Sequence, residues 1–516
     1  MKHHFDVIVL GRSIGALVAA ALLARRDFTV LVLGQGALAP TYRVDELTLH
    51  RRAFSFLGAE CPAWRRVIIE LAQSQTWKRR ALAAEPMLQA IAPGFRLDVP
   101  SDADLFAREV ERQFPALRRV VEDLHQHLRE VNDAADRAFE ADVLWPPGTF
   151  WERRETAKCA AQLPYVHAEP DADLLGEFPR GHFYRQFVRA AVLYGTHLST
   201  TPPPFAAARL FGSSTRGLVR LDGGEAELES FLVERVRTHG GQCRLGDRAS
   251  ALHLRRGVAA GVLVDGEDDA IGCEFVLTDL DGESLASLAG GQGIHKRALR
   301  EWPRITSTVG RFVVSIVAKT KGLPEPLGPE VMLFLAKNPW PTRARPPAIH
   351  LLRFDQPGEH TLLVAELLLP DNGAVRVVDA RELVLDAVLA ELPFLERHLV
   401  LVDSPHDGGP IWRFVPGATS GAPLRRVELD RTTFGLAPVE PMVRQLEVDP
   451  PGYLGLSGEP IRGPIERTLL VGRSVLPALG QEGELLAAWG AARLVTKADR
   501  RKTVLRRDMW TKLEFG

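Results

Sequence analysis

Hydrophobic residues at the start of the chain fall into three runs separated by short polar breaks. The segment FDVIVLGRSIGALVAAALLARRDFTVLVLGQG, residues 5–36, has an apolar run, a glycine-containing turn, a long apolar stretch and a second apolar run that ends near Gly34. Short apolar runs bounded by turn residues are typical of buried strands, and the longer stretch between them has the length of a helix. The pattern therefore predicts a strand, a helix and a second strand.

A mostly helical region follows this opening unit. Residues 101–141 place apolar side chains at helical spacing, and Ser101 or Asp102 can cap the first turn. Proline removes a backbone donor and clashes with the preceding turn, so Pro115 marks a kink or a break between two helices. We expect two consecutive helices here.

The middle and the end of the chain return to strand and helix signals. The predicted elements are a helix at about 225–238, short strands ending at 275–278, strands at 311–319, 331–336, 348–354 and 361–369, a helix within 376–392, and a strand, a glycine-rich loop and a helix within 467–495. Segments typical of a nucleotide-binding domain therefore lie at the start, middle and end, separated by two insertions. The predicted fold class is α/β.

Composition and charge exclude several classes of protein. The 516 residues are 46% hydrophobic and 25% charged, with 64 basic and 65 acidic side chains, so the chain is globular and has no bulk charge to attract nucleic acid. Four cysteines without C-x-x-C spacing argue against a disulfide framework and a zinc site, which favours a reducing, cytoplasmic compartment. No apolar run approaches the roughly 18 residues of a membrane-spanning helix. Contact with a membrane surface stays open.

The turn after the first strand carries the chemistry that matters most. In a dinucleotide-binding turn, G-x-G-x-x-G/A glycines let a pyrophosphate approach the free amides of a helix N-terminus. The corresponding residues here are Gly11, Ser13 and Ala16, with an additional Gly15. Ser13 puts a side chain where the phosphates approach, and Gly34 stands where an acidic residue should bind the ribose.

Three interpretations of this loop follow. It is a nucleotide site, or it is an ordinary β–α–β turn kept for packing, or G-R-S-I-G is the nucleophile elbow of a hydrolase. The turn follows the first strand, so no earlier loop is available to donate the second oxyanion amide, which argues against the hydrolase. A metal site is not predicted either, since His125 and His127 do not share a helix face.

Taken together, the three segments resemble the FAD-dependent amine oxidase and phytoene desaturase superfamily. The opening resembles the family's DVIVVGAGIGGL start, and residues 223–281, from GG through FLVERVRTHGGQCRL to FVLTDLD, look like its adenine-covering segment. The ending, residues 470–495, is similar to its C-terminal flavin loop. The resemblance implies a discontinuous Rossmann-like FAD/NAD(P)-binding domain (1–60, 215–290 and 455–500), an α+β substrate domain (61–214 and 291–454) and a tail (501–516).

Cofactor-binding residues are implied by the same resemblance, position by position. The pyrophosphate would lie near the loop residues, the adenine near the backbone of Ala249, and the flavin near the C-terminal loop, where a helix starting near Glu482 would point at the ring. The implied set is Gly11, Arg12, Ser13, Gly15, Ala16, Ala249, Gly472, Arg473, Gly480, Glu482 and Gly483. No catalytic side chain is implied, because the flavin itself accepts hydride.

The sequence departs from the family where FAD should touch. Gly34 replaces the ribose acid, and the expected G-G-R segment after it is absent. Arg12 and Arg473 each lie in a G-R-S tripeptide. They either clamp the pyrophosphate, or pair with Glu482 or Glu484 in a site without phosphate, or are solvated.

Two functions are consistent with these observations. The first is an FAD-dependent oxidoreductase of the desaturase type that removes hydride from a bulky apolar, isoprenoid or lipid-like substrate. The second is a flavin-free, non-catalytic member of the fold that binds a lipid-like group or a protein, as Rab GDP-dissociation inhibitors do. The expected partner is an apolar small molecule and not nucleic acid.

Overall fold

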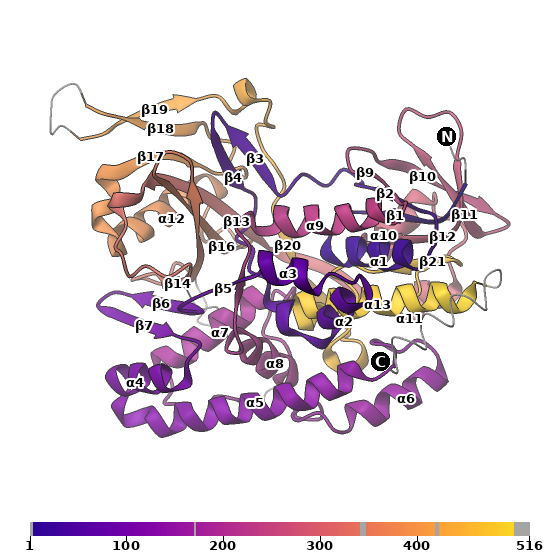
Figure 1. Ribbon diagram of the computed structural model, residues 1–516, viewed down its shortest axis with the longest axis horizontal. Coiled ribbons are helices and arrows are strands. Elements are labelled where there is room, and N and C mark those ends of the chain that lie inside the picture. Colours follow the sequence, from indigo (N-terminus) through magenta and orange to yellow (C-terminus); the bar gives the residue numbers. More distant parts are fainter. Residues whose placement is uncertain (1–3, 170–171, 341–346, 418–422, 500–516) are drawn as a thin grey trace.

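Two sheets and a layer of helices make up the computed structural model, which describes residues 4–169, 172–340, 347–417 and 423–499 (Figure 1). The first sheet has seven strands in the order β10-β11-β12-β1-β2-β9, with β21 paired to β12. The strands are β1 His4–Leu10, β2 Val30–Leu33, β9 Gln242–Arg244, β10 Ala249–Arg255, β11 Val258–Val264, β12 Ile271–Thr278 and β21 Thr468–Leu470. The strand–helix–strand start and the strands in the middle and at the end are confirmed.

Strands β1, β2, β9, β12 and β21 of this sheet run parallel to one another. Their carboxyl ends therefore meet at one edge, which we call the carboxyl edge, and it is where ligands bind in open parallel sheets. Three helices lie side by side along the sheet, with α1 in contact with the other two (Figure 1). They are α1 Ile14–Arg25, α9 Gly224–Thr238 and α13 Gly480–Ala498.

The second sheet has ten strands and is mostly antiparallel. Its order is β19-β18-β17-β13-β16-β15-β14-β6-β7, with β20 paired to β13. The strands are β6 Leu88–Ala92, β7 Phe95–Val99, β13 Arg304–Lys319, β14 Glu330–Phe334, β15 Ala348–Gln356, β16 His360–Pro370, β17 Leu399–Asp403, β18 Ile411–Val415, β19 Arg425–Leu429 and β20 Val443–Asp449. Helix α12, Val377–Glu391, packs its apolar face on this sheet and closes a second core.

A layer of helices lies along the lower side of both sheets in Figure 1. It includes α4 Ala103–Gln113, α5 Arg118–Glu140, α6 Phe150–Ala160, α7 Phe183–Gly195 and α8 Pro204–Ser214. The predicted break at Pro115 is confirmed, since α4 ends and α5 begins on either side of it, and Asp102 is the residue that caps α4. Smaller elements are α2 Pro62–Glu70, α3 Ser74–Arg80, α10 Gly282–Leu288, α11 Lys296–Glu301, the β3–β4 pair (Thr41–Val44, Leu47–His50) and the β5–β8 pair (Leu82–Ala83, Val219–Arg220).

The α/β fold class is confirmed, and all strands of the first sheet come from the three segments that the resemblance assigned to one domain. The exact domain boundaries stay a prediction. The predicted tail, 501–516, lies outside the described residues.

Candidate functional site

The turn between β1 and α1 has the backbone shape that the sequence predicted. Gly11 has φ of +124°, a conformation that glycine adopts without steric cost, and its amide donates to the Leu33 carbonyl at 2.8 Å. Ser13 caps α1, and its hydroxyl accepts from the amide of Ala16 at 3.3 Å. Gly15 lets α1 approach the backbone just after β21, because a Cβ there would lie 1.9 Å from the Val471 carbonyl oxygen.

Two carboxylates of the chain itself lie at the N-terminus of α1. Asp279, directly after β12, accepts from the amide of Ser13 at 2.8 Å, and Glu484 of α13 lies 3.4 Å from the amide of Gly15. A Cβ on Gly11 would lie about 2 Å from the Asp279 carboxylate, so that carboxylate fills the space beside the glycine. A helix N-terminus attracts anions, and here the anions are side chains.

The electrostatics of Asp279 reflect this crowding. Burial is the main cause that raises the pKa of its carboxyl, and the nearby Glu484 carboxylate raises it further, against the amide of Ser13. The bonds that Glu484 makes, above all with His197, hold the pKa of Glu484 below its usual value although burial alone would raise it. The helix N-terminus is therefore already supplied with negative charge.

The adenine end of the predicted site is also occupied by a side chain. Gln35 donates from Nε2 to the Ala249 carbonyl at 3.0 Å and accepts at Oε1 from the Ala249 amide at 2.9 Å. Gln35 therefore bonds to both polar backbone groups of Ala249, the residue that the resemblance placed beside the adenine. At Gly34 a Cβ would lie 1.9 Å from the carbonyl oxygen of Leu245, so the ribose position has neither a carboxylate nor free space.

The first G-R-S arginine is paired within the chain. Arg12 makes a bidentate ion pair with Glu229 of α9, at 2.8 and 2.5 Å, and also donates to the Ala37 carbonyl at 3.1 Å. Both charged side chains are 13% exposed. The interpretation of Arg12 as a solvated arginine is therefore wrong, and its charge is already neutralised.

The second G-R-S arginine is the start of a buried chain of hydrogen bonds. Arg473 donates from Nε to Nδ1 of His197 at 3.3 Å, and Nε2 of His197 lies 2.8 Å from Glu484. Burial and the Arg473 charge lower the pKa of His197 to about 4, so the ring is neutral, accepts at Nδ1 and donates at Nε2. Arg473 thus reaches Glu484 only through the histidine.

The guanidinium of Arg473 is held in unfavourable surroundings. Burial, together with the charges of Arg52 and Arg311, lowers the pKa of Arg473 to about 9. Its Nη2 atom is buried and has no hydrogen-bond partner within the described part of the chain. The half-buried pair Arg52–Glu225, at 2.7 Å, and the buried pair Arg311–Glu366, at 2.6 Å, balance the neighbouring charges.

At the start of α13, where the flavin was expected, Glu482 is bound by another side chain. Arg209 of α8 donates to both oxygens of Glu482, at 2.8 and 2.7 Å, and to Asp136 of α5 at 2.7 Å. Arg209 is 1% exposed. The alternative in which Glu482 pairs with a G-R-S arginine is therefore wrong, and Arg209 joins α5, α8 and α13.

Three glycines predicted near the flavin are required by the packing of the backbone. A Cβ at Gly472 would lie 2.3 Å from the Asp279 carbonyl oxygen, one at Gly480 would lie 2.0 Å from that of Gly195, and one at Gly483 would lie 2.2 Å from that of Leu476. The structure thus gives each a local reason to be glycine. Their role toward a cofactor stays a prediction.

Taken together, these contacts do not fit FAD. The amide of Ser13 and the backbone of Ala249 are each bonded to a side chain of the chain itself, and the helix N-terminus faces two carboxylates. Beside the start of α13, the cavity lined by His197, Arg311 and Gln481 has a volume of about 40 Å³. That is room for one or a few waters, whereas pockets for larger ligands measure roughly 300–1,000 Å³.

Sequence reasoning missed Asp279, Gln35, Arg209 and His197. Asp279 follows a buried strand and Gln35 follows Gly34, so each could have been suspected from its place at a strand end. Arg209 and His197 lie on other elements, and nothing in the local pattern connects them to α13.

The described residues contain neither a metal-binding cluster nor a membrane-spanning helix. Within the described ranges, no group of three or more histidine, cysteine, aspartate or glutamate side chains is arranged to hold a metal ion. No helix in those ranges is long and apolar enough to cross a bilayer.

Several solved structures share this fold at low sequence identity. An oxidoreductase from Methanosarcina mazei matches with a TM-score of 0.56 and 14% identity, over 95% of this chain and 99% of that one. The PF1083 protein from Pyrococcus furiosus gives 0.54 and 12% (95% and 97%), and cyclohexylamine oxidase from Brevibacterium oxydans gives 0.52 and 13% (96% and 99%). No protein-family model and no curated protein sequence matches the chain. These likenesses confirm the fold that the resemblance implied.

Proposed function

We propose that this chain is a flavin-independent binding protein that uses the fold of FAD-dependent oxidoreductases, with a bulky apolar or lipid-like molecule as its ligand. One observation supports the first part: side chains of the protein bond to the backbone groups that would hold the pyrophosphate and the adenine. Asp279 accepts a hydrogen bond from the amide of Ser13, and Gln35 bonds to both the amide and the carbonyl of Ala249.

The charges at the predicted site also disfavour the binding of FAD. A pyrophosphate brought to the N-terminus of α1 meets Asp279 and Glu484, and the nearest arginine, Arg12, is already neutralised by Glu229. Like charges at such distances repel, most strongly where water is excluded. A pyrophosphate would also lack charge-assisted hydrogen bonds from Arg12, and such bonds contribute roughly 1.5–3 kcal/mol each.

The shared fold favours a second candidate, an FAD-dependent oxidoreductase of the desaturase type that takes hydride from a bulky apolar substrate. This function requires Asp279 and Gln35 to leave their present partners before FAD binds. The two candidates therefore differ in a property that is easily measured.

The test is the absorption spectrum of the purified full chain, before and after incubation with FAD and removal of the unbound cofactor. We expect no flavin bands in either sample. The double variant Asp279→Ser/Gln35→Ala, which frees the Ser13 amide and the Ala249 backbone, serves as a comparison and should retain more FAD than the natural chain. A yellow natural protein that retains about one FAD per chain would support the oxidoreductase instead.

A second comparison uses the two G-R-S arginines. If they clamp a cofactor, the variant Arg12→Ala/Arg473→Ala loses flavin that the natural chain retains. If the chain is flavin-independent, both proteins lack flavin, and the variant is less stable because the Glu229 carboxylate has lost its partner.

A further inference from the structure

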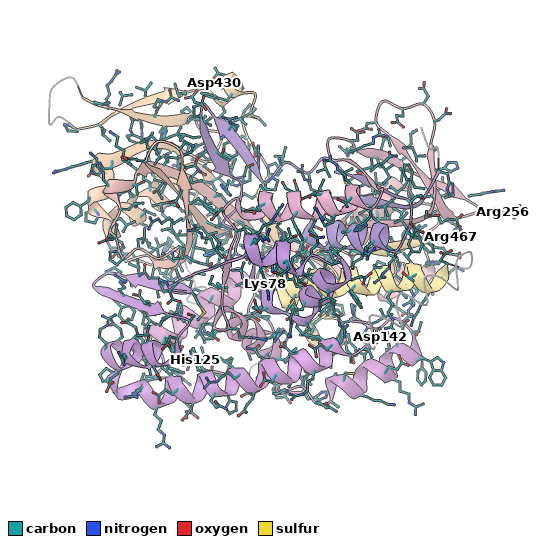
Figure 2. All side chains as sticks on the ribbon, viewed as in Figure 1. Lys78, His125, Asp142, Arg256, Asp430 and Arg467 are labelled. Atoms are coloured by element: carbon teal, nitrogen blue, oxygen red, sulfur yellow. The ribbon has the colours of Figure 1, made fainter. Side chains whose placement is uncertain are left out.

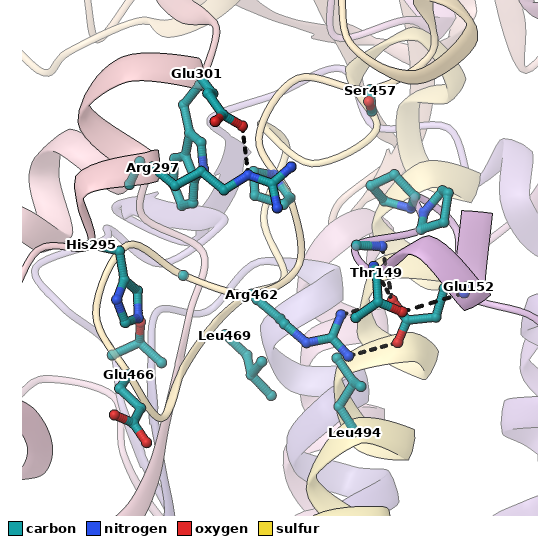
Figure 3. Close-up of a pocket in the computed structure, with 18 of the residues that line it drawn as sticks. Thr149, Glu152, His295, Arg297, Glu301, Ser457, Arg462, Glu466, Leu469 and Leu494 are labelled. Atoms are coloured by element: carbon teal, nitrogen blue, oxygen red, sulfur yellow. Dashed lines mark hydrogen bonds and ion pairs between the residues drawn. The ribbon is translucent and has the colours of Figure 1, made fainter.

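A large cavity lies at the opposite end of α13 from the carboxyl edge. Its volume is about 1110 Å³, and its walls come from the start of β21, the last turn of α13, the surroundings of α11 and the loop before α6 (Figure 3). At 1.5 Å per residue, Glu482 and Lys497 are about 22 Å apart along the helix axis. We call this the distal cavity, and it is separate from the predicted cofactor site.

Aromatic and aliphatic side chains make up much of its inner surface. Phe275, Trp302 and Tyr453 are half-buried, and Ile465 and Leu469 are buried at 1% and 6% exposure. A volume of this size meets the range of small-molecule sites, which are typically apolar with a few polar groups. The inner surface therefore suits an apolar chain or ring.

The carboxylates Glu152 and Glu301 of the cavity wall are already neutralised. Glu152 pairs with Arg462 at 2.7 Å, and Glu301 pairs with Arg297 at 2.6 Å, as the dashed lines in Figure 3 show. Glu152 also accepts from the backbone amide of Thr149. Neither carboxylate is free to bind an added cation.

Cations, in contrast, remain available around the mouth. Arg153, Lys296 and Lys497 line the cavity, are exposed and have no carboxylate partner within the described ranges. Glu466 is the one lining carboxylate without a cation partner in those same ranges. Arg467, at the same end of the molecule in Figure 2, pairs with Glu274 at 3.2 Å. The mouth therefore carries a net positive charge, which attracts anions.

We propose that the distal cavity binds a single-chain anionic amphiphile of the fatty-acid class. The acyl chain lies on Phe275, Trp302 and Tyr453, and the carboxylate lies at the mouth near Lys296 and Lys497. This assignment rests on the proposed function in one respect, that the chain acts by binding.

Calorimetric titration of the full chain with monomeric dodecanoate tests the proposal. We expect saturable binding, about fourfold weaker for each methylene removed, because each buried methylene contributes a roughly constant free energy. Dodecyltrimethylammonium has the same chain with the opposite charge and should bind at least tenfold more weakly. Equal binding of the two amphiphiles, or no binding of dodecanoate, overturns the proposal.

Charge-reversal variants locate the site. Lys296→Glu/Lys497→Glu should weaken dodecanoate binding at least tenfold, whereas the matched control Lys319→Glu/Lys321→Glu, at the end of β13 in the second sheet, should change it less than twofold. If the two double variants weaken dodecanoate binding equally, the assignment of the ligand to the distal cavity is overturned.

Two other occupants are outcomes of the same measurements. A gain of tenfold or more in dodecanoate affinity in Trp510→Ala/Leu513→Ala identifies segment 500–516 as the occupant, and binding only to anionic phospholipid vesicles identifies a membrane surface. Either result overturns the proposal. The flavin absorbance of the same samples is recorded, so a failure here is distinguishable from a failure of the proposed function.

Discussion

The charged side chains at the two ends of α13 differ in whether they have partners within the protein. Near the start of α13, Glu482 and Glu484 are buried and bonded to Arg209 and His197, and the neighbouring helix N-terminus faces Asp279. At its last turn, Lys497 borders a cavity of about 1110 Å³ and has no carboxylate partner in the described chain. Charges at the first end are committed to the fold, and charges at the second end are available to a ligand. The carboxyl edge, where this fold suggests a ligand, therefore has its charged groups paired, whereas cations without a carboxylate partner in the described residues lie at the distal cavity.

The largest expected effect tests whether charges at the first end hold the fold. Arg209→Leu leaves Glu482 and Asp136 buried without their shared cation, and breaking a buried pair in this way costs about 3–5 kcal/mol. Urea unfolding should show this loss of unfolding free energy. Arg118→Ala, which removes an exposed pair with Glu122, is the control and should leave the free energy of unfolding almost unchanged. Similar losses for both would contradict the comparison.

A pH effect of similar size is expected from Glu459, in the loop that precedes β21. Burial raises the pKa of its carboxyl from the usual 4.5 to about 7, with Asp281 and Glu283 adding to the shift. The folded state then favours the protonated acid, so the contribution of Glu459 to stability is fully present below about pH 4.5 and is lost as the pH rises to about 7. The fall is about 3 kcal/mol. In Glu459→Gln, the free energy of unfolding should vary less over this interval, and an unchanged slope would contradict the assignment.

A smaller loss is expected where the adenine was predicted. Gln35→Ala removes two hydrogen bonds to Ala249, at 3.0 and 2.9 Å, and should cost about 1–2 kcal/mol because the site is partly exposed to water. Gln126→Ala, on the exposed face of α5, is the matched control and should have almost no effect. If both variants are equally stable, Gln35 is not part of the packed site.

The smallest expected effect is at the other end of α13. Lys296→Ala and Lys497→Ala remove exposed cations without partners in the described chain, so each should change the unfolding free energy by no more than about 0.5 kcal/mol. Urea unfolding measures this directly. A loss above about 1 kcal/mol would mean that these lysines belong to the fold, as the carboxylates of the first end do.

Local pattern was enough to predict the frame of the molecule. Apolar runs identified β1, α1 and β2, and the proline rule separated α4 from α5. Ser13 was expected to obstruct a phosphate, and it is also the cap of α1. These features depend on neighbouring residues, so the sequence carries them.

The partners at the carboxyl edge could not be predicted in the same way. Ser13 and Asp279 are 266 residues apart, and Arg209 and Glu482 are 273 apart. Side chains at such separations meet only once the sheet is assembled. The sequence showed that Gly34 lacks a carboxylate, but it did not show that Gln35 bonds to Ala249.

A crystal structure of the full chain grown with excess FAD tests the central claim most directly, because it shows which atoms bond to the backbone groups of the predicted site. The account predicts the Asp279 carboxylate on the Ser13 amide and the Gln35 side chain on Ala249, with no flavin density at the carboxyl edge. A pyrophosphate on the Ser13 amide, with Asp279 displaced and adenine at Ala249, would contradict it.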